Sequence, residues 1–174
     1  LTRKFRQSVT GSGALALVLA ASACSHKAPT GTSAKNIKTL PASTVSGSFL
    51  GLTPASENIK DSLQSQEGNS YISGVALYSL RKGDQLEATL QLSKLSSSAR
   101  PKDEKFQQLV AGQIGGTKVQ PFVMGGRVVY RSSLRQQSLT SWFTGDYFMI
   151  LSVRSPYKTP RPLLRVLLKA VDPK

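Results

Sequence analysis

The sequence predicts an α+β domain: an antiparallel sheet of about six strands with two to three helices packed on one face. Apolar and polar residues alternate over several short stretches, as in strands with one buried face. Gly-containing turns join these stretches in pairs, which is typical of β-hairpins. Other segments carry apolar residues at the 3.6-residue period of a helix. Because the strands come as hairpins, we expect an antiparallel sheet.

The first three expected elements are one helix and two strands that form a hairpin. Thr53 and Pro54 fit an N-cap and a first helical residue, so a helix is expected to begin there. Residues 72–80 are apolar on both faces, as in a central strand. Apolar and polar residues alternate over residues 86–92, which predicts one buried face and one wet face with Glu87, Thr89 and Gln91. The turn-forming residues 81–84 between them predict a hairpin.

The second half of the chain is expected to hold a helix, four strands and a last helix. Residues 106–114 place apolar side chains along one side of a helix, and Gly115 and Gly116 follow it. The last helix is expected to begin at Thr159 and Pro160 and to carry leucines on one face. The strands between these helices form two hairpins, at residues 119–124 and 127–132 and at residues 139–143 and 147–153.

Composition limits the chemistry of this domain. The chain has 174 residues, of which 39% are hydrophobic, so it is too apolar to be wholly disordered. Its one cysteine excludes an internal disulfide and a multi-cysteine metal site. Its one histidine, His26, lies outside the expected domain. We therefore expect no metal and no cofactor.

The first residues have the pattern of an export signal. A basic stretch, residues 3–6, precedes residues 13–23, which carry no charge and end at Cys24. Eleven residues at about 1.5 Å each cannot cross a hydrocarbon core about 30 Å thick. This favours a secretory signal over a membrane-spanning helix. The small residues 21–23 directly before Cys24 resemble the lipobox of bacterial lipoproteins.

The resemblance implies that residues 1–23 are removed and that Cys24 carries a diacylglyceryl group. Acyl chains, each stabilised by about 0.8 kcal/mol per buried CH2, would hold the protein on the extracytoplasmic face of the cell membrane. The alternatives are an ordinary cleaved signal peptide and a membrane-spanning anchor. Residues 24–45 are polar and lack apolar periodicity, so we expect a lipidated cysteine followed by a flexible tether. Residues 46–174 are the expected single domain.

Catalytic motifs are weak in this sequence. Ser155 and Lys158 match the Ser-x-x-Lys spacing of penicillin-binding enzymes, but Ser79 and Lys82 match it as well, and the companion motifs are absent. A site of two carboxylates would have to draw on Asp84, Glu87, Asp103, Glu104 or Asp146. Asp84 and Asp146 fit turns, and Asp103 and Glu104 fit a helix N-terminus. We therefore expect no enzyme; the alternative is a small extracytoplasmic hydrolase with a Ser/Lys or carboxylate site.

Positive charge is the remaining signal. The chain carries 23 Lys and Arg against 9 Asp and Glu, a formal net charge of +14. Arg161, Arg165 and Lys169 lie at i, i+4 and i+8 of the last helix, opposite its leucines, and Arg154 and Lys158 come just before it. A second cluster comprises Arg127, Arg131 and Arg135. Such residues are either a solvated face or a contact for an anionic partner.

The partners that fit this charge are anionic lipid, a wall polymer or an acidic envelope protein. Nucleic acid is not expected, because it would need aromatic residues exposed among the basic ones. Tyr130, Trp142 and Tyr147 instead lie within apolar strands, where packing in the core is expected. The sequence therefore favours a membrane-anchored, non-catalytic binding or accessory module at the cell envelope.

Overall fold

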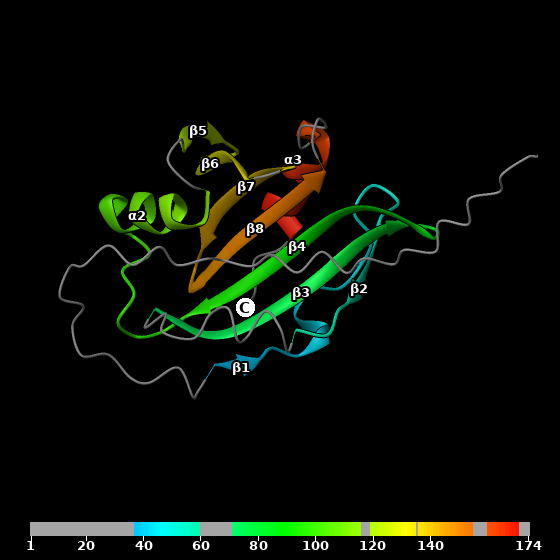
Figure 1. Cartoon of the computed structure of the whole chain (residues 1–174), viewed down its shortest axis with the longest axis horizontal. Helices are drawn as coiled ribbons and strands as arrows, with labels where there is room; N and C mark the ends of the chain where they lie inside the picture. Colours follow the sequence, from blue (N-terminus) through cyan, green and yellow to red (C-terminus); the bar gives the residue numbers. More distant parts are fainter. Residues whose placement is uncertain (1–36, 60–70, 116–118, 135, 155–159, 171–174) are drawn as a thin grey trace, which may run out of the picture.

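The computed structural model describes residues 37–59, 71–115, 119–134, 136–154 and 160–170 (Figure 1). The expected signal peptide, Cys24 and residues 25–36 lie outside these ranges. The strands are β1 (Lys38–Thr39), β2 (Thr53–Ser56), β3 (Ile72–Lys82), β4 (Gln85–Leu95), β5 (Gln120–Met124), β6 (Arg127–Leu134), β7 (Gln137–Thr144) and β8 (Tyr147–Arg154). The helices are α2 (Glu104–Gly115), α3 (Arg161–Ala170) and a short 3-10 helix, η2 (Ala42–Thr44).

Within the described residues, all strands join in one sheet of order β1-β3-β4-β8-β7-β6-β5, and β2 also pairs with β3. Every pairing is antiparallel except that of β1 with β3. The expected hairpins are confirmed: β3 with β4, β5 with β6, and β7 with β8. Gly125 and Gly126, with φ of 61° and 76°, form the two-residue turn between β5 and β6.

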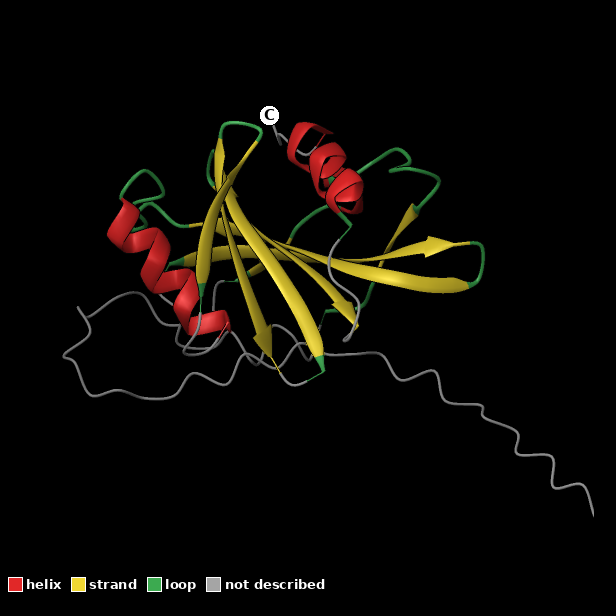
Figure 2. Ribbon diagram, turned by 90° about the horizontal axis from the view of Figure 1, so that it is seen from above, coloured by secondary structure: helices red, strands yellow, loops and turns green. Residues whose placement is uncertain are grey.

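The two α-helices cover opposite faces of the sheet (Figure 2). On β8, Met149 and Leu151 belong to the apolar cluster that contains the leucines of α3. Phe148 and Ile150 belong to the cluster that contains Phe106 of α2. The prediction that the helices share one face was wrong. Because the central strands are apolar on both faces, each face needs a cover.

The number of strands also differs from the prediction, since the sheet has eight strands instead of about six. Thr53 and Pro54 begin β2 and pair with Arg81 and Leu80 of β3, so no helix begins there. The Thr-Pro pair fits a helix start and an edge strand equally well, because proline is tolerated where no ladder hydrogen bond is donated. The edge of β3 is available for pairing, and this tertiary contact favours a strand over a helix at Thr53 and Pro54.

Residues 37–45, which the sequence assigned to the tether, are part of the folded domain. Lys38 pairs with Gly74 of β3, and the backbone N–H of Leu40 donates to the carbonyl of Val75 at 2.9 Å. The Tyr78 hydroxyl lies 3.2 Å from the carbonyl oxygens of Pro41 and Ala42, to which it donates. Burial raises the pKa of this hydroxyl above its ordinary value. These contacts fix residues 38–42 to the sheet.

Candidate functional site

Helix α3 has one buried and one basic side. Its four leucines are buried in the core: Leu163, Leu164, Leu167 and Leu168. Arg161, Arg165 and Lys169 are exposed on the other side, and we call them the α3 basic row. A rise of about 1.5 Å per residue places successive members about 6 Å apart along the helix. These three members of the predicted contact set are therefore exposed, and their contact with an anionic partner stays a prediction.

The α3 basic row is not neutralised within the part of the chain that the structure describes. Helix α3 carries no Asp or Glu. None of its three cations forms an ion pair with another described residue. In the sequence, Asp146 is the one acid between residues 105 and 171, and Asp172 follows Lys169 by three residues, outside the described residues. A cationic surface of this kind attracts anions without having to break internal pairs first.

The two described arginines of β6 lie on the same side of the sheet as α3. Val129 belongs to the α3-side cluster, and residues two positions away along a strand share its face. Arg131 lies 4.8 Å from the centroid of the Phe122 ring, which is a cation–π contact. Arg127 donates to the Thr144 hydroxyl at 2.6 Å. Both arginines are half-buried and have internal partners, whereas Arg135 lies outside the described residues.

The predicted anion-contact set is therefore only partly brought together. Arg154 is exposed at the end of β8. Strand alternation places it on the α2 side with Ile150 and Ser152, across the sheet from α3. Lys158 lies outside the described residues. The candidate site is the α3 basic row alone.

Three of the predicted acids lie in turns or at a helix start. The Asp103 Oδ1 atom accepts the backbone N–H of Lys105 at 2.9 Å and so caps α2. Asp84 and Asp146 are exposed in the turns of two hairpins. Among the described residues, no group of three or more His, Cys, Asp or Glu could hold a metal ion.

The Ser-x-x-Lys pairs give no assembled site in the described chain. Ser79 is buried and accepts a hydrogen bond from Arg81 Nε at 3.2 Å. Lys82, three residues on along the same strand, points to the opposite face. Ser155 and Lys158 fall outside the described ranges.

Sequence reasoning missed a polar layer on the α2 side of the sheet. Gln91 was expected on a wet face, but it is 4% exposed and donates to the Ser93 hydroxyl at 3.2 Å. Ser152 donates to Gln137 Oε1 at 2.9 Å. The buried polar residues on this side are Ser79, Gln91, Ser93, Ser132, Ser141 and Ser152. The alternation of Glu87, Thr89 and Gln91 with apolar residues predicts a solvated face, because the sequence does not show which residues cover that face.

The aromatic residues of the strands lie in the interior. Tyr130 and Trp142 are buried as expected, and Tyr147 is half-buried against the α3-side cluster. The Tyr130 hydroxyl donates to Gln107 Oε1 at 3.0 Å and so links β6 to α2. Burial, and secondarily the charge of Glu104, raises the pKa of Tyr130.

The fold and this surface define a class: a small α+β domain with helices on both faces and a cationic surface on its last helix. Comparison of the chain with protein-family models, with curated proteins and with solved structures gave no match. None of the described helices is long and apolar enough to cross a membrane.

Proposed function

We propose that the protein is a lipid-anchored, extracytoplasmic binding module that contacts an anionic partner through the α3 basic row. In this proposal Cys24 carries the lipid, and the domain that begins at β1 is the binding part. The observation that supports it most is the surface of α3, where three exposed cations stand in line with no acid on the helix. The lipobox-like residues 21–23 support the anchor.

The anchor is tested by the intact mass of the protein extracted from membranes. We expect the wild-type chain to lack residues 1–23 and to carry the mass of a diacylglyceryl group, and Cys24→Ser to lack this added mass. An unmodified, freely secreted wild-type protein would contradict the anchor.

The binding surface is tested by charge reversal with a control of equal charge. One variant replaces Arg161, Arg165 and Lys169 with Glu. The control replaces three exposed cations at or just before the start of α2 with Glu: Arg100, Lys102 and Lys105. Both variants change the net charge equally, so a non-specific effect of charge weakens binding to anionic vesicles or polymers in both. We expect the loss in the first variant alone, and equal losses would remove the proposal.

A further inference from the structure

We infer that in the anchored protein the α3 basic row faces away from the membrane and binds a linear polymer with repeated phosphate or carboxylate groups. This inference rests on the proposed function, in which Cys24 carries the lipid. Its basis is the place where the tether joins the fold, together with the chemistry of the α3 surface.

The tether joins the domain at one edge of the sheet. The described chain begins at Ile37, directly before β1, and β1 is the first strand in the sheet order. Its pairing with Gly74 and Val75 of β3 fixes this junction. A lipid at Cys24 therefore pulls on the β1 edge of the domain and favours an orientation with that edge toward the bilayer.

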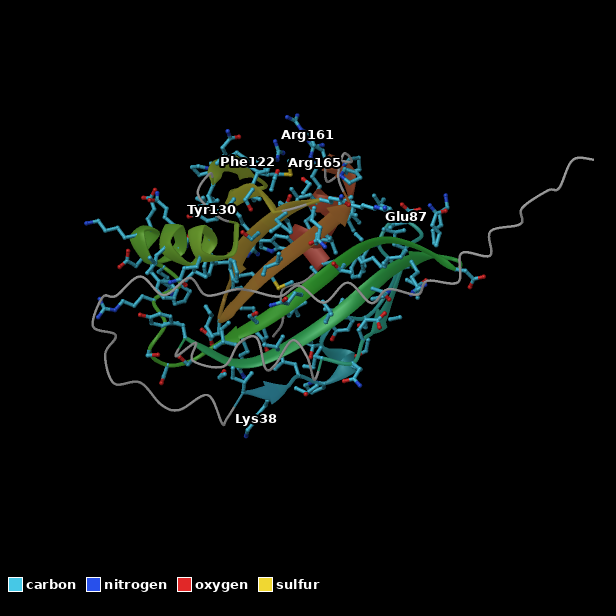
Figure 3. All side chains as sticks on the ribbon, in the orientation of Figure 1. Lys38, Glu87, Phe122, Tyr130, Arg161 and Arg165 are labelled. Atoms are coloured by element: carbon cyan, nitrogen blue, oxygen red, sulfur yellow. The ribbon has the colours of Figure 1, made fainter. Side chains whose placement is uncertain are left out.

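Arg161 and Arg165 of the α3 basic row lie toward the opposite end of the molecule. In Figure 3, Lys38 lies at the lower end of the domain, whereas Arg161 and Arg165 lie at the upper end. A separation seen in one view can only be larger in three dimensions. The sheet itself is six strand spacings wide from β1 to β5, about 29 Å measured along it. The Debye length at physiological salt is about 8 Å, so a bilayer beside β1 has little attraction for this end.

Helix α3 also lacks the apolar residues with which a surface helix enters a bilayer. Its four leucines are at most 4% exposed, and Val166 is half-buried against the same cluster. The exposed large apolar residues of the described chain are Leu50, Leu86, Leu109, Val123 and Val128, none of them on α3. Interfacial helices bury an apolar face among the lipids, so the contact available to α3 is electrostatic alone.

A linear polyanion fits the remaining chemistry of the α3 basic row. Its three cations are about 6 Å apart along one line, so they can pair with successive charges of a chain. Two of them are arginines, whose planar guanidinium groups bind phosphate and carboxylate in a bidentate way. The absence of acids on α3 means that no like charge repels the polymer along this line.

The orientation is tested with the lipidated full chain in vesicles of phosphatidylcholine and phosphatidylglycerol. Cys24 is the chain's one cysteine, and lipid attachment occupies its thiol, so an introduced cysteine accepts a dye specifically. The two labelling sites are Lys38→Cys on β1 and Val123→Cys on β5, both exposed. We expect stronger energy transfer to a headgroup dye from position 38 than from position 123. Stronger transfer from position 123 would overturn the orientation.

The partner is tested on the same vesicles with long-chain polyphosphate in solution. We expect the wild-type protein to bind it with a salt dependence that reports counterion release. Reversal of the α3 basic row should weaken binding at least roughly tenfold. It should lower the slope of log K against log salt by about 2, from three lost contacts at about 0.7 each. The control reversal of Arg100, Lys102 and Lys105 should leave affinity within about threefold.

The outcomes separate the two proposals. A protein without lipid on Cys24, or one that binds neither polyphosphate nor anionic vesicles, contradicts the proposed function and this inference with it. Binding of the α3 basic row to phosphatidylglycerol, with position 123 close to the headgroups, supports the proposed function and overturns the inference. Polyphosphate binding that reversal of the row leaves unchanged also overturns it.

Discussion

Helix α3 holds the candidate site in place through its leucines, so truncating one of them tests this part of the fold. Leu167 is 0% exposed within the α3-side cluster. Substitution of a buried leucine by alanine costs about 2.7–5.0 kcal/mol, depending on the cavity that remains. Because α3 packs on the sheet from one side and can settle partly into the gap, we expect Leu167→Ala to lower the free energy of unfolding by about 3 kcal/mol. This corresponds to a fall in Tm of about 10 °C for a domain of this size.

The chain provides both a probe and a matched control for this measurement. Trp142 is its one tryptophan and is fully buried in the same cluster, so its fluorescence follows unfolding in urea. Leu109 on α2 is 53% exposed, and Leu109→Ala should change the free energy of unfolding by less than about 0.5 kcal/mol. A loss below about 1 kcal/mol for Leu167→Ala would refute the packing of α3 on the sheet.

Three further predictions concern other parts of the domain. Asp103→Ala removes the cap of α2 and should cost about 1 kcal/mol in urea unfolding; Asp103→Ser should recover most of it. The pKa of Tyr130 is raised by burial, so its contribution to stability is complete below about pH 10 and is lost as pH rises through the folded pKa. Tyr130→Phe should therefore flatten the fall of the urea midpoint above that pH, and an unchanged slope would contradict the assignment. A Cβ at Gly74 would lie 2.7 Å from Leu40 Cδ2 and 3.2 Å from the Lys38 carbonyl oxygen. Gly74→Ala should thus loosen β1 and speed hydrogen exchange at the Leu40 amide roughly tenfold, with β7 unaffected.

The sequence predicted an element correctly where its local pattern agrees with the tertiary contacts of that element. The hairpin turns and the leucine period of α3 lie in local sequence, so their elements appear where expected. The prediction of a helix beginning at Thr53 was wrong because Thr53 and Pro54 pair with the edge of β3. Likewise, β1 is only two residues long, and no local pattern marks so short a strand. Its pairing with β3 depends on residues about 36 positions away in the chain.

The same reasoning explains the site. The period of Arg161, Arg165 and Lys169 gives the basic row from sequence alone, because a helix fixes which residues share a side. Periodicity within one helix says nothing about which side of the sheet that helix covers. Arg154 was therefore grouped with the row, although strand alternation places it across the sheet. The polar layer of Gln91 and Ser93 was missed for the same reason.

The position of Arg161 distinguishes a binding surface from one that serves solubility alone. It is the first residue of α3, and the first turn of this helix carries no acid. A cation at a helix N-terminus opposes the macrodipole, at a cost of about 0.3–1 kcal/mol. Stability and solubility together would favour an acid there, as Glu104 is placed at the start of α2. We therefore expect Arg161→Glu to raise the free energy of unfolding by about 0.5 kcal/mol and to weaken polyphosphate binding. A variant that becomes more stable and keeps its full affinity would show that Arg161 belongs to a solvated face.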